Sequence, residues 1–428
     1  MGLAIVATLS LATLSLGARE ATAEALLLVD AETGKVLHAE NAAYPWYPAS
    51  VTKLMTAYVS LKAIKDGRIT ADSLFSVSPN AVAQQPSKMG FPIGTQVTVD
   101  NALKMLMVKS ANDMAVVLAE GVSGSIEKFA DEMNRTAARL GMTQSSFVNP
   151  NGLPADEQIT SARDLAILAR ALLRDFPEYD LYWHIPAIKF GRRIMRNTNR
   201  LIDAYPGADG MKTGFICASG FNLVATATRA NKRLIAVVLG APSSPVRAVK
   251  AAQLFERGFS ENVLAWLTPS LGTVDALQPV NATPPNLRED MCGKHRKRPA
   301  AEDADDDIPN RNDPSSPYAI LLSSLRTPQA KGAALIGTGY ATMPPIVVYT
   351  GPKKSAAEAE LAAAAAAKPA RTAKRTTAPK DAAAKSEAAK PDGDSRGAKP
   401  AAATNGEAKK PKAKSAAKPA ATTAPTAR

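Results

Sequence analysis

Three short motifs with side chains suited to chemistry occur along the chain. In order they are Ser50-Val-Thr-Lys53, Ser110-Ala-Asn112 and Lys212-Thr-Gly214. A serine hydroxyl is a weak nucleophile until a neighbouring base takes its proton. Because residues three apart are neighbours on a helix, one helical turn would bring the amine of Lys53 to the hydroxyl of Ser50. The motifs therefore indicate a serine nucleophile activated by a lysine.

A histidine base of the kind found in catalytic triads is not indicated here. The chain has three histidines, and His38, His184 and His295 all lie away from the three motifs. A lysine accepts a proton only when it is uncharged, and burial favours the uncharged amine. We therefore predict that Lys53 is the base.

Spacing alone is weak evidence, because the chain contains matching sequences elsewhere. Ser125-Ile-Glu-Lys128 repeats the first spacing, and Ser78-Pro-Asn80 repeats the second. Context favours Ser50, which follows a proline at the start of a predicted helix. The third motif opens a β-type run after a turn rich in proline and glycine. The inference depends on the order of the motifs and on these settings.

The elements that must position these residues follow from hydrophobic periodicity. We predict a hairpin of residues 25–30 and 35–40, helices at 49–64, 100–108, 113–120, 126–140, 161–173 and 245–259, and strands at 210–216, 221–229 and 233–239. Helices and strands are segregated along the chain rather than alternating. The pattern predicts an α+β domain over residues 24–265, in which helices back an antiparallel sheet beside a mostly helical subdomain.

The N-terminus has the features of a cleavable secretory signal. An apolar run from Leu3 to Leu16 is too short to span a bilayer, and a small-residue triplet, Ala21-Thr-Ala23, follows it. The run lacks a preceding lysine or arginine, which departs from the usual form. We predict a signal peptide at residues 1–23, and hence a secreted protein of the periplasm that is either soluble or peripheral on the envelope.

Residues 266–352 give no clear fold, although residues 344–349 are a candidate strand. An acidic run at residues 302–307 lacks the spacing of a calcium-binding loop. Two cysteines are present, Cys217 and Cys292. In an oxidising compartment they would form one disulfide, and two free thiols are the alternative.

The last part of the chain, residues 353–428, is dominated by alanine, lysine, proline and threonine. Its near lack of large apolar residues predicts disorder. It carries 17 basic and 7 acidic residues and so contributes +10 of the net charge of +13. Such a tail suits an anionic envelope surface rather than nucleic acid, and a solvated linker is the alternative.

Together the motifs and their flanking residues resemble the serine D-alanyl-D-alanine carboxypeptidases, which are low-molecular-mass penicillin-binding proteins. The resemblance covers about residues 25–259. It extends to residues 48–56, residues 147–153, Asn199-Arg200 and residues 209–214. It implies a penicillin-binding, β-lactamase-like fold, a peptidoglycan stem peptide as substrate, covalent reaction with β-lactam antibiotics, and no cofactor or metal.

The resemblance assigns a role to each motif residue. Ser50 would be the acylated nucleophile and Lys53 its base, while Ser110 would relay a proton to the leaving D-alanine nitrogen. Asn112 would hold the substrate amide and the lysine in register.

The residues of the third motif would bind the end of the substrate. Lys212 and Thr213, with Arg200, would receive its terminal carboxylate, and Gly214 would also contact the substrate. The backbone N–H groups of Ser50 and Phe215 would form the oxyanion hole.

Three other functions share parts of this pattern. A β-lactamase would need a second base for hydrolysis, and no Glu-x-x-Leu-Asn element lies between the second and third motifs. A D,D-endopeptidase acting on cross-links would use the same motifs. A wall-binding scaffold would keep a vestigial catalytic domain and act through its basic tail. Structural roles are also open for single residues, and Asn112 is a candidate cap for the helix that follows it.

Overall fold

The computed structural model describes residues 24–260, 269–294 and 343–352, together with Ser355 and Glu358. Its centre is a five-stranded antiparallel sheet in the order β2-β1-β9-β8-β7. The strands are β1 (Ala25–Asp30), β2 (Val36–Glu40), β7 (Ala208–Ile216), β8 (Gly220–Arg229) and β9 (Lys232–Ala241). The predicted hairpin is confirmed, because β1 pairs with β2 in antiparallel register.

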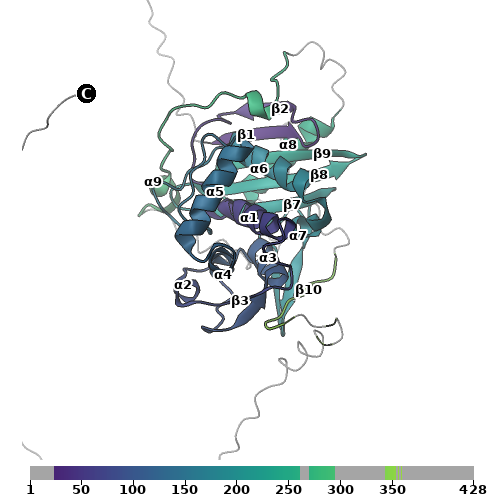
Figure 1. Cartoon of the computed structure of the whole chain (residues 1–428). Helices are drawn as coiled ribbons and strands as arrows, with labels where there is room; N and C mark the ends of the chain where they lie inside the picture. The colour runs from purple at the N-terminus through teal and green to yellow at the C-terminus, as the bar shows by residue number, and fades with distance from the viewer. Residues whose placement is uncertain (1–23, 261–268, 295–342, 353–354, 356–357, 359–428) are drawn as a thin grey trace, which may run out of the picture. The chain divides into compact units, whose positions relative to one another are not determined.

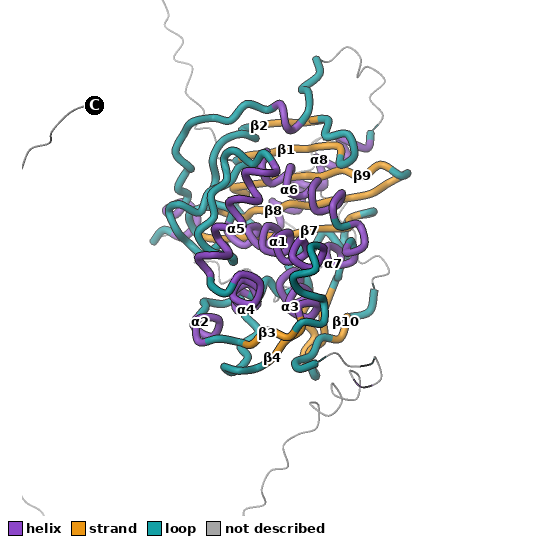
Figure 2. Tube along the Cα trace, viewed as in Figure 1, coloured by secondary structure: helices purple, strands orange, loops and turns teal. Residues whose placement is uncertain are grey.

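The α-helices of the described residues are α1 (Lys53–Lys65), α2 (Pro79–Ala83), α3 (Val99–Val108), α4 (Asn112–Ser123), α5 (Ile126–Leu140), α6 (Ala162–Asp175), α7 (Leu181–His184), α8 (Ser244–Phe259) and α9 (Arg288–Cys292). The 3-10 helices are η1 (Ala49–Thr52), η2 (Pro177–Tyr179) and η4 (Val274–Ala276). Figure 2 shows α1 and α5 crossing in front of the orange strands of the sheet. The α+β prediction is confirmed.

Both faces of the sheet are buried, which follows from alternation along the inner strands. Ile235 and Val237 of β9 pack with buried residues of α1 and α6. Ala236 and Val238 pack on the opposite face with Phe255 of α8. The sheet is therefore the middle of three layers, with β7 as one of its edge strands.

A second group of elements lies beyond β7 (Figure 1). It contains the helices α2, α3 and α4 and the two-stranded sheet β3 (Leu74–Ser76) and β4 (Gln96–Thr98). A third sheet has the order β10-β5-β6, with β5 (Ala187–Phe190), β6 (Arg193–Arg196) and β10 (Ile346–Val347). The candidate strand at residues 344–349 is thus confirmed as β10, which pairs with β5 in parallel.

Part of the segment from residue 266 onward packs on the main body. Lys35 bridges to Thr273, and the backbone N–H of Leu287 donates to the carbonyl of Ala218 at 2.9 Å. The predicted signal peptide, the acidic run at residues 302–307 and nearly all of the predicted tail lie outside the described residues. Within the described ranges, no helix combines the length and the apolar character needed to cross a membrane.

Candidate active site

Ser50 lies in the 3-10 turn η1, directly before α1. The residue before it, Ala49, has a φ of +50°, which turns the chain sharply out of the Pro48 segment. No side chain caps η1 or α1, so the hydroxyl of Ser50 is not used in helix capping. Its Oγ lies 2.9 Å from Nζ of Lys53. The two side chains meet as their spacing predicts, although the turn is 3-10 at Ser50 and α-helical only from Lys53 onward.

Lys53 has no exposed surface. Besides the Ser50 contact, its Nζ donates to Asn112 Oδ1 at 2.7 Å and to the backbone carbonyl of Asn151 at 2.8 Å. A buried amine of this kind is stable only when its polar contacts are satisfied. The first two motifs are therefore joined through a single amine.

Asn112 is the first residue of α4, and the N-cap position belongs to Ala111. Its side-chain Nδ2 donates to the backbone carbonyl of Gln85 at 2.8 Å, while its Oδ1 accepts from Lys53. The capping role left open by the sequence is therefore wrong, since both ends of the side-chain amide are engaged in the site.

Ser110 lies between α3 and α4 with a φ of +59°, a left-handed conformation that a serine rarely adopts. It is 4% exposed, and its Oγ has no hydrogen-bond partner within the described ranges. A buried hydroxyl without a partner is costly for folding and is common where a ligand completes the bonding. This placement suits a hydroxyl that acts on a bound substrate.

The segment of residues 85–90 is held against the start of α4. Carboxylate oxygens of Asp113 accept from the backbone N–H groups of Met89 at 3.1 Å and Gly90 at 2.9 Å. Burial raises the pKa of the Asp113 carboxyl above its ordinary value, and these N–H donors oppose that rise. Ser87 adds a bond from its Oγ to the carbonyl of Lys109 at 2.9 Å. The segment thereby positions the Gln85 carbonyl that holds Asn112.

The third motif lies on the edge strand β7, where Lys212 and Thr213 are each 1% exposed. A Cβ added to Gly214 would lie 2.8 Å from the backbone nitrogen of Ser50 and 3.0 Å from the carbonyl of Pro48. Only a glycine permits this approach of β7 to η1. The backbone donors of the nucleophile and of the third motif are therefore neighbours.

One residue that sequence reasoning missed is Thr198. Its Oγ1 lies 2.7 Å from Oγ1 of Thr213, so it stands directly beside the third motif. The flanking asparagines hold it there, because Asn197 donates to the carbonyl of Ile185 at 2.9 Å and Asn199 donates to that of Gly210 at 2.7 Å. In the sequence, the one available sign of this site was a threonine between two asparagines, just before Arg200. Arg200 follows on the same loop and is partly buried.

Asn151 was also missed, although it lies in the stretch that carries the family resemblance. Its neighbour Gly152 has a φ of +80°, and a Cβ there would lie 1.8 Å from the carbonyl oxygen of Ala49. The turn is thus pressed against η1, which brings the Asn151 carbonyl to Lys53. A backbone acceptor has no side-chain signature, so the sequence alone could not reveal it.

The end of β7 is secured by two further contacts. The ring of Phe215 packs on that of Phe221 at 4.3 Å between centroids. Cys217 and Cys292 form a disulfide, which decides between the two states left open by the sequence. Within the described ranges, no cluster of three or more acidic, histidine or cysteine side chains has the arrangement of a metal site.

Residues 12–243 match the model of the peptidase S11 family, D-alanyl-D-alanine carboxypeptidase. The chain belongs to this family. It is 37% identical over 244 residues to the D-alanyl-D-alanine carboxypeptidase DacA of Haemophilus influenzae. That match covers 56% of the chain and 62% of the relative, so the similarity spans less than two thirds of the relative's length.

Solved structures of family members have the same fold. Penicillin binding protein 5 from Haemophilus influenzae is 36% identical with a TM-score of 0.53, covering 56% of this chain and 71% of that one. Penicillin-Binding Protein D2 from Listeria monocytogenes, in its cefotaxime-bound form, is 29% identical with a TM-score of 0.51. The latter match covers 55% of this chain and 96% of the Listeria chain.

Proposed function

We propose that the chain is a serine-type D-Ala-D-Ala carboxypeptidase that removes the terminal D-alanine from peptidoglycan stem pentapeptides through an acyl-enzyme. The observation that carries this proposal is the set of contacts around the Lys53 amine. Ser50 Oγ lies 2.9 Å from it, and two carbonyl oxygens lie within 2.8 Å. Family membership supports the same reaction class.

To act as a base, Lys53 would have to be a neutral amine, which has two N–H donors and one lone pair. The oxygens of Asn112 and Asn151 accept but cannot donate, so they take the two N–H groups. The lone pair is then left for the hydroxyl proton of Ser50. In this protonation state Lys53 removes that proton as Ser50 Oγ attacks the carbonyl carbon of the substrate.

The developing oxyanion would lie between the backbone N–H groups of Ser50 and Phe215. The approach of Gly214 to the Ser50 nitrogen supports this arrangement, since it brings strand β7, which carries Phe215, beside the backbone of Ser50 in η1. Backbone N–H groups that are already in place stabilise the negative charge of the oxyanion without moving during the reaction.

The remaining motif residues would act on the leaving group and on the end of the substrate. Ser110, whose Oγ has no partner within the described residues, would pass a proton to the nitrogen of the departing D-alanine. Lys212, Thr213 and Arg200 would bind the terminal carboxylate, as a cation beside a hydroxyl suits an anion. Asn112 would hold the substrate amide with its side chain.

Water then releases the shortened stem peptide from Ser50. β-Lactams would acylate the same serine, a proposal supported by the cefotaxime-bound form of the similar Listeria protein. We place the protein in the periplasm, where the disulfide between Cys217 and Cys292 would be stable. Binding of the basic tail to an anionic envelope surface stays a prediction.

A product assay tests the function. The purified protein would be given a stem pentapeptide and a cross-linked stem dimer, and the products identified by mass. We expect loss of one alanine from the pentapeptide, and no loss with Ser50→Ala, which should also fail to bind a fluorescent penicillin. Release of monomers from the dimer without trimming of the pentapeptide would instead indicate an endopeptidase. Penicillin labelling of Ser50→Ala would overturn the assignment of the nucleophile.

A further inference from the structure

A cluster of positive charge lies directly before the substrate end of the site. Residues 187–200 contain five basic residues and no acidic residue, namely Lys189, Arg192, Arg193, Arg196 and Arg200. The first four belong to the hairpin of β5 and β6, here called the arginine hairpin (residues 187–196). None of these four takes part in the proposed reaction.

The hairpin presents its charge to solvent. β6 is the edge strand of its sheet, so its outer backbone groups have no strand partner within the described residues. Lys189 pairs with Ile194, and Ala187 pairs with Arg196, so these four side chains share one face. Ile194 is 57% exposed, and the side chain of Arg196 is 64% exposed. Arg192 in the turn and Arg193, which pairs with Phe190, are exposed as well, so both this face and the turn of the hairpin are open to a partner.

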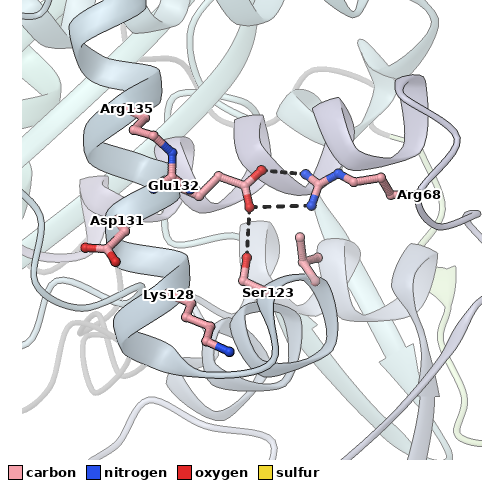
Figure 3. A pocket seen from close by; sticks show the side chains of 7 residues that line it. Arg68, Ser123, Lys128, Asp131, Glu132 and Arg135 are labelled. Atoms are coloured by element: carbon pink, nitrogen blue, oxygen red, sulfur yellow. Dashed lines mark hydrogen bonds and ion pairs between the residues drawn. The ribbon is translucent and has the colours of Figure 1, made fainter.

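The charges of the hairpin are poorly compensated. Arg196 makes a long ion pair with Asp203 at 3.9 Å, and within the described residues Lys189, Arg192 and Arg193 make none. The pocket in Figure 3 shows a different pattern: Arg68 is paired with Glu132 at 2.5 Å, and Asp131 lies on the same helix as Lys128. Two acidic residues offset most of the charge of the three basic residues in that pocket, whereas the hairpin has no acidic residue, so the hairpin attracts anions more strongly.

The hairpin continues into the site through Asn197 and Thr198. Thr198 touches Thr213 of the third motif at 2.7 Å, and Arg193 precedes Thr198 by five residues. At about 3.3 Å per residue in a strand, the charges begin within roughly 16 Å of the site. A peptide substrate that extends a few residues beyond the site would therefore contact the hairpin.

We propose that the arginine hairpin binds carboxylates of polymeric peptidoglycan that neighbour the stem peptide held in the site. This inference rests on the proposed function and adds a second contact to it. Each uncrosslinked stem ends in a carboxylate before and after trimming, so a polymer carrying many stems presents many carboxylates. Its charge is complementary to the hairpin, and a single soluble peptide lacks the neighbouring stems. The hairpin thus favours the polymer over a free peptide.

The test compares two double variants. Arg192→Gln with Arg193→Gln removes two hairpin charges that have no ion pair within the described residues. Lys128→Gln with Arg135→Gln removes two exposed charges from α5 and is the matched control. Each protein is measured for sedimentation with purified peptidoglycan sacculi at low salt, and for D-alanine release from sacculi and from a short neutral peptide ending in D-Ala-D-Ala.

We expect the hairpin variant to bind sacculi about fivefold to tenfold less tightly, with a weaker salt dependence, because two exposed charge pairs are lost. Turnover of the short peptide should stay within about twofold of the unaltered protein, because neither arginine contacts that substrate. The control should match the unaltered protein in every measurement. Amidating the carboxylates of the sacculi should reduce binding of the unaltered protein to the level of the hairpin variant.

Equal binding of sacculi by both variants would overturn the inference. Hairpin-dependent sedimentation with phosphatidylglycerol vesicles but not with sacculi would also overturn it, in favour of a lipid surface. If the unaltered protein binds sacculi through the hairpin but releases no D-alanine, the proposed carboxypeptidase function would be wrong. Binding of peptidoglycan by the hairpin would still be supported. The two failures are therefore distinguishable.

Discussion

Two places in the described part of the chain have the same spacing of serine and lysine, and only one of them brings the two side chains together. At Ser50 and Lys53 the two side chains meet at 2.9 Å, and the lysine has no exposed surface. At Ser125 and Lys128 the serine is the N-cap of α5, and its Oγ accepts from the backbone N–H of Lys128 at 3.2 Å. Lys128 is exposed, and its side chain lines the pocket drawn in Figure 3.

The difference shows that the Ser-x-x-Lys spacing alone does not predict whether the two side chains meet. A serine three residues before a lysine is also a good helix cap, because the N-cap hydroxyl bonds to the backbone N–H three positions on. Ser78 does the same for α2, through the N–H of Ala81. At Ser50 no cap forms, and the surrounding turn and strand enclose the lysine instead. Burial by distant segments converts a local spacing into a catalytic pair.

The largest effect should come from removing the amine at each place. Lys53→Met should lower kcat/KM for D-alanine release by about a thousandfold, because a general base is lost. Lys128→Met should leave it unchanged. Steady-state release of D-alanine and the rate of labelling by a fluorescent penicillin measure both variants. A Lys53→Met protein that folds and keeps more than about a tenth of the activity would contradict the base assignment.

The next effect concerns the glycine that lies beside each serine. Gly214→Ala would push β7 away from the Ser50 nitrogen, and we expect acylation to slow by about a hundredfold. Gly124 precedes Ser125 with a φ of +84° and open space around its Cβ position. Gly124→Ala should therefore cost about 1 kcal/mol of stability through backbone strain and leave acylation unchanged. Equal acylation rates in the two variants would show that close approach of β7 is not required.

Ser110 allows catalysis to be separated from folding. Ser110→Ala should lower kcat by about tenfold to a hundredfold without lowering the melting temperature, since its Oγ has no hydrogen bond within the described residues. Ser87→Ala is the control, because it removes the bond to the Lys109 carbonyl and should cost about 1 kcal/mol of stability. Thermal unfolding and turnover are measured together. A loss of stability in Ser110→Ala with full turnover would reverse the assignment.

The smallest effect is expected at the capping serine. Ser125→Ala should lower the free energy of unfolding by about 1 kcal/mol, because α5 loses its N-cap. Ser125→Asp should keep most of that stability, since aspartate caps equally well. Neither change should alter D-alanine release. Chemical denaturation measures the first effect, and any large loss of turnover would mean that the second pair also acts in the reaction.

The fold was predictable where local signals agree. The helix predicted at residues 126–140 is found as α5 with those bounds, because Ser125 caps its start and Gly141 ends it with a φ of +78°. The short elements α2, α7, β3 and β4 were not predicted, since three to five residues carry too little periodicity. Their existence depends on packing between distant segments.

The site was predictable in its side chains and not in its backbone. Ser50, Lys53 and Asn112 come together as the motifs suggest. The carbonyl of Asn151, 98 residues from Lys53, completes the set and has no signature in the sequence. Thr198 was overlooked because its contact with Thr213 depends on how two buried asparagines hold the loop.

The disulfide joins two cysteines that are 75 residues apart. Any single proteolytic cut between Ala218 and Met291 would therefore leave both fragments covalently attached. On a denaturing gel, a nicked protein would run as one band until a thiol reductant separates the pieces. The N-terminal fragment, which contains Lys212 on β7, would thus stay linked through the disulfide to the C-terminal fragment.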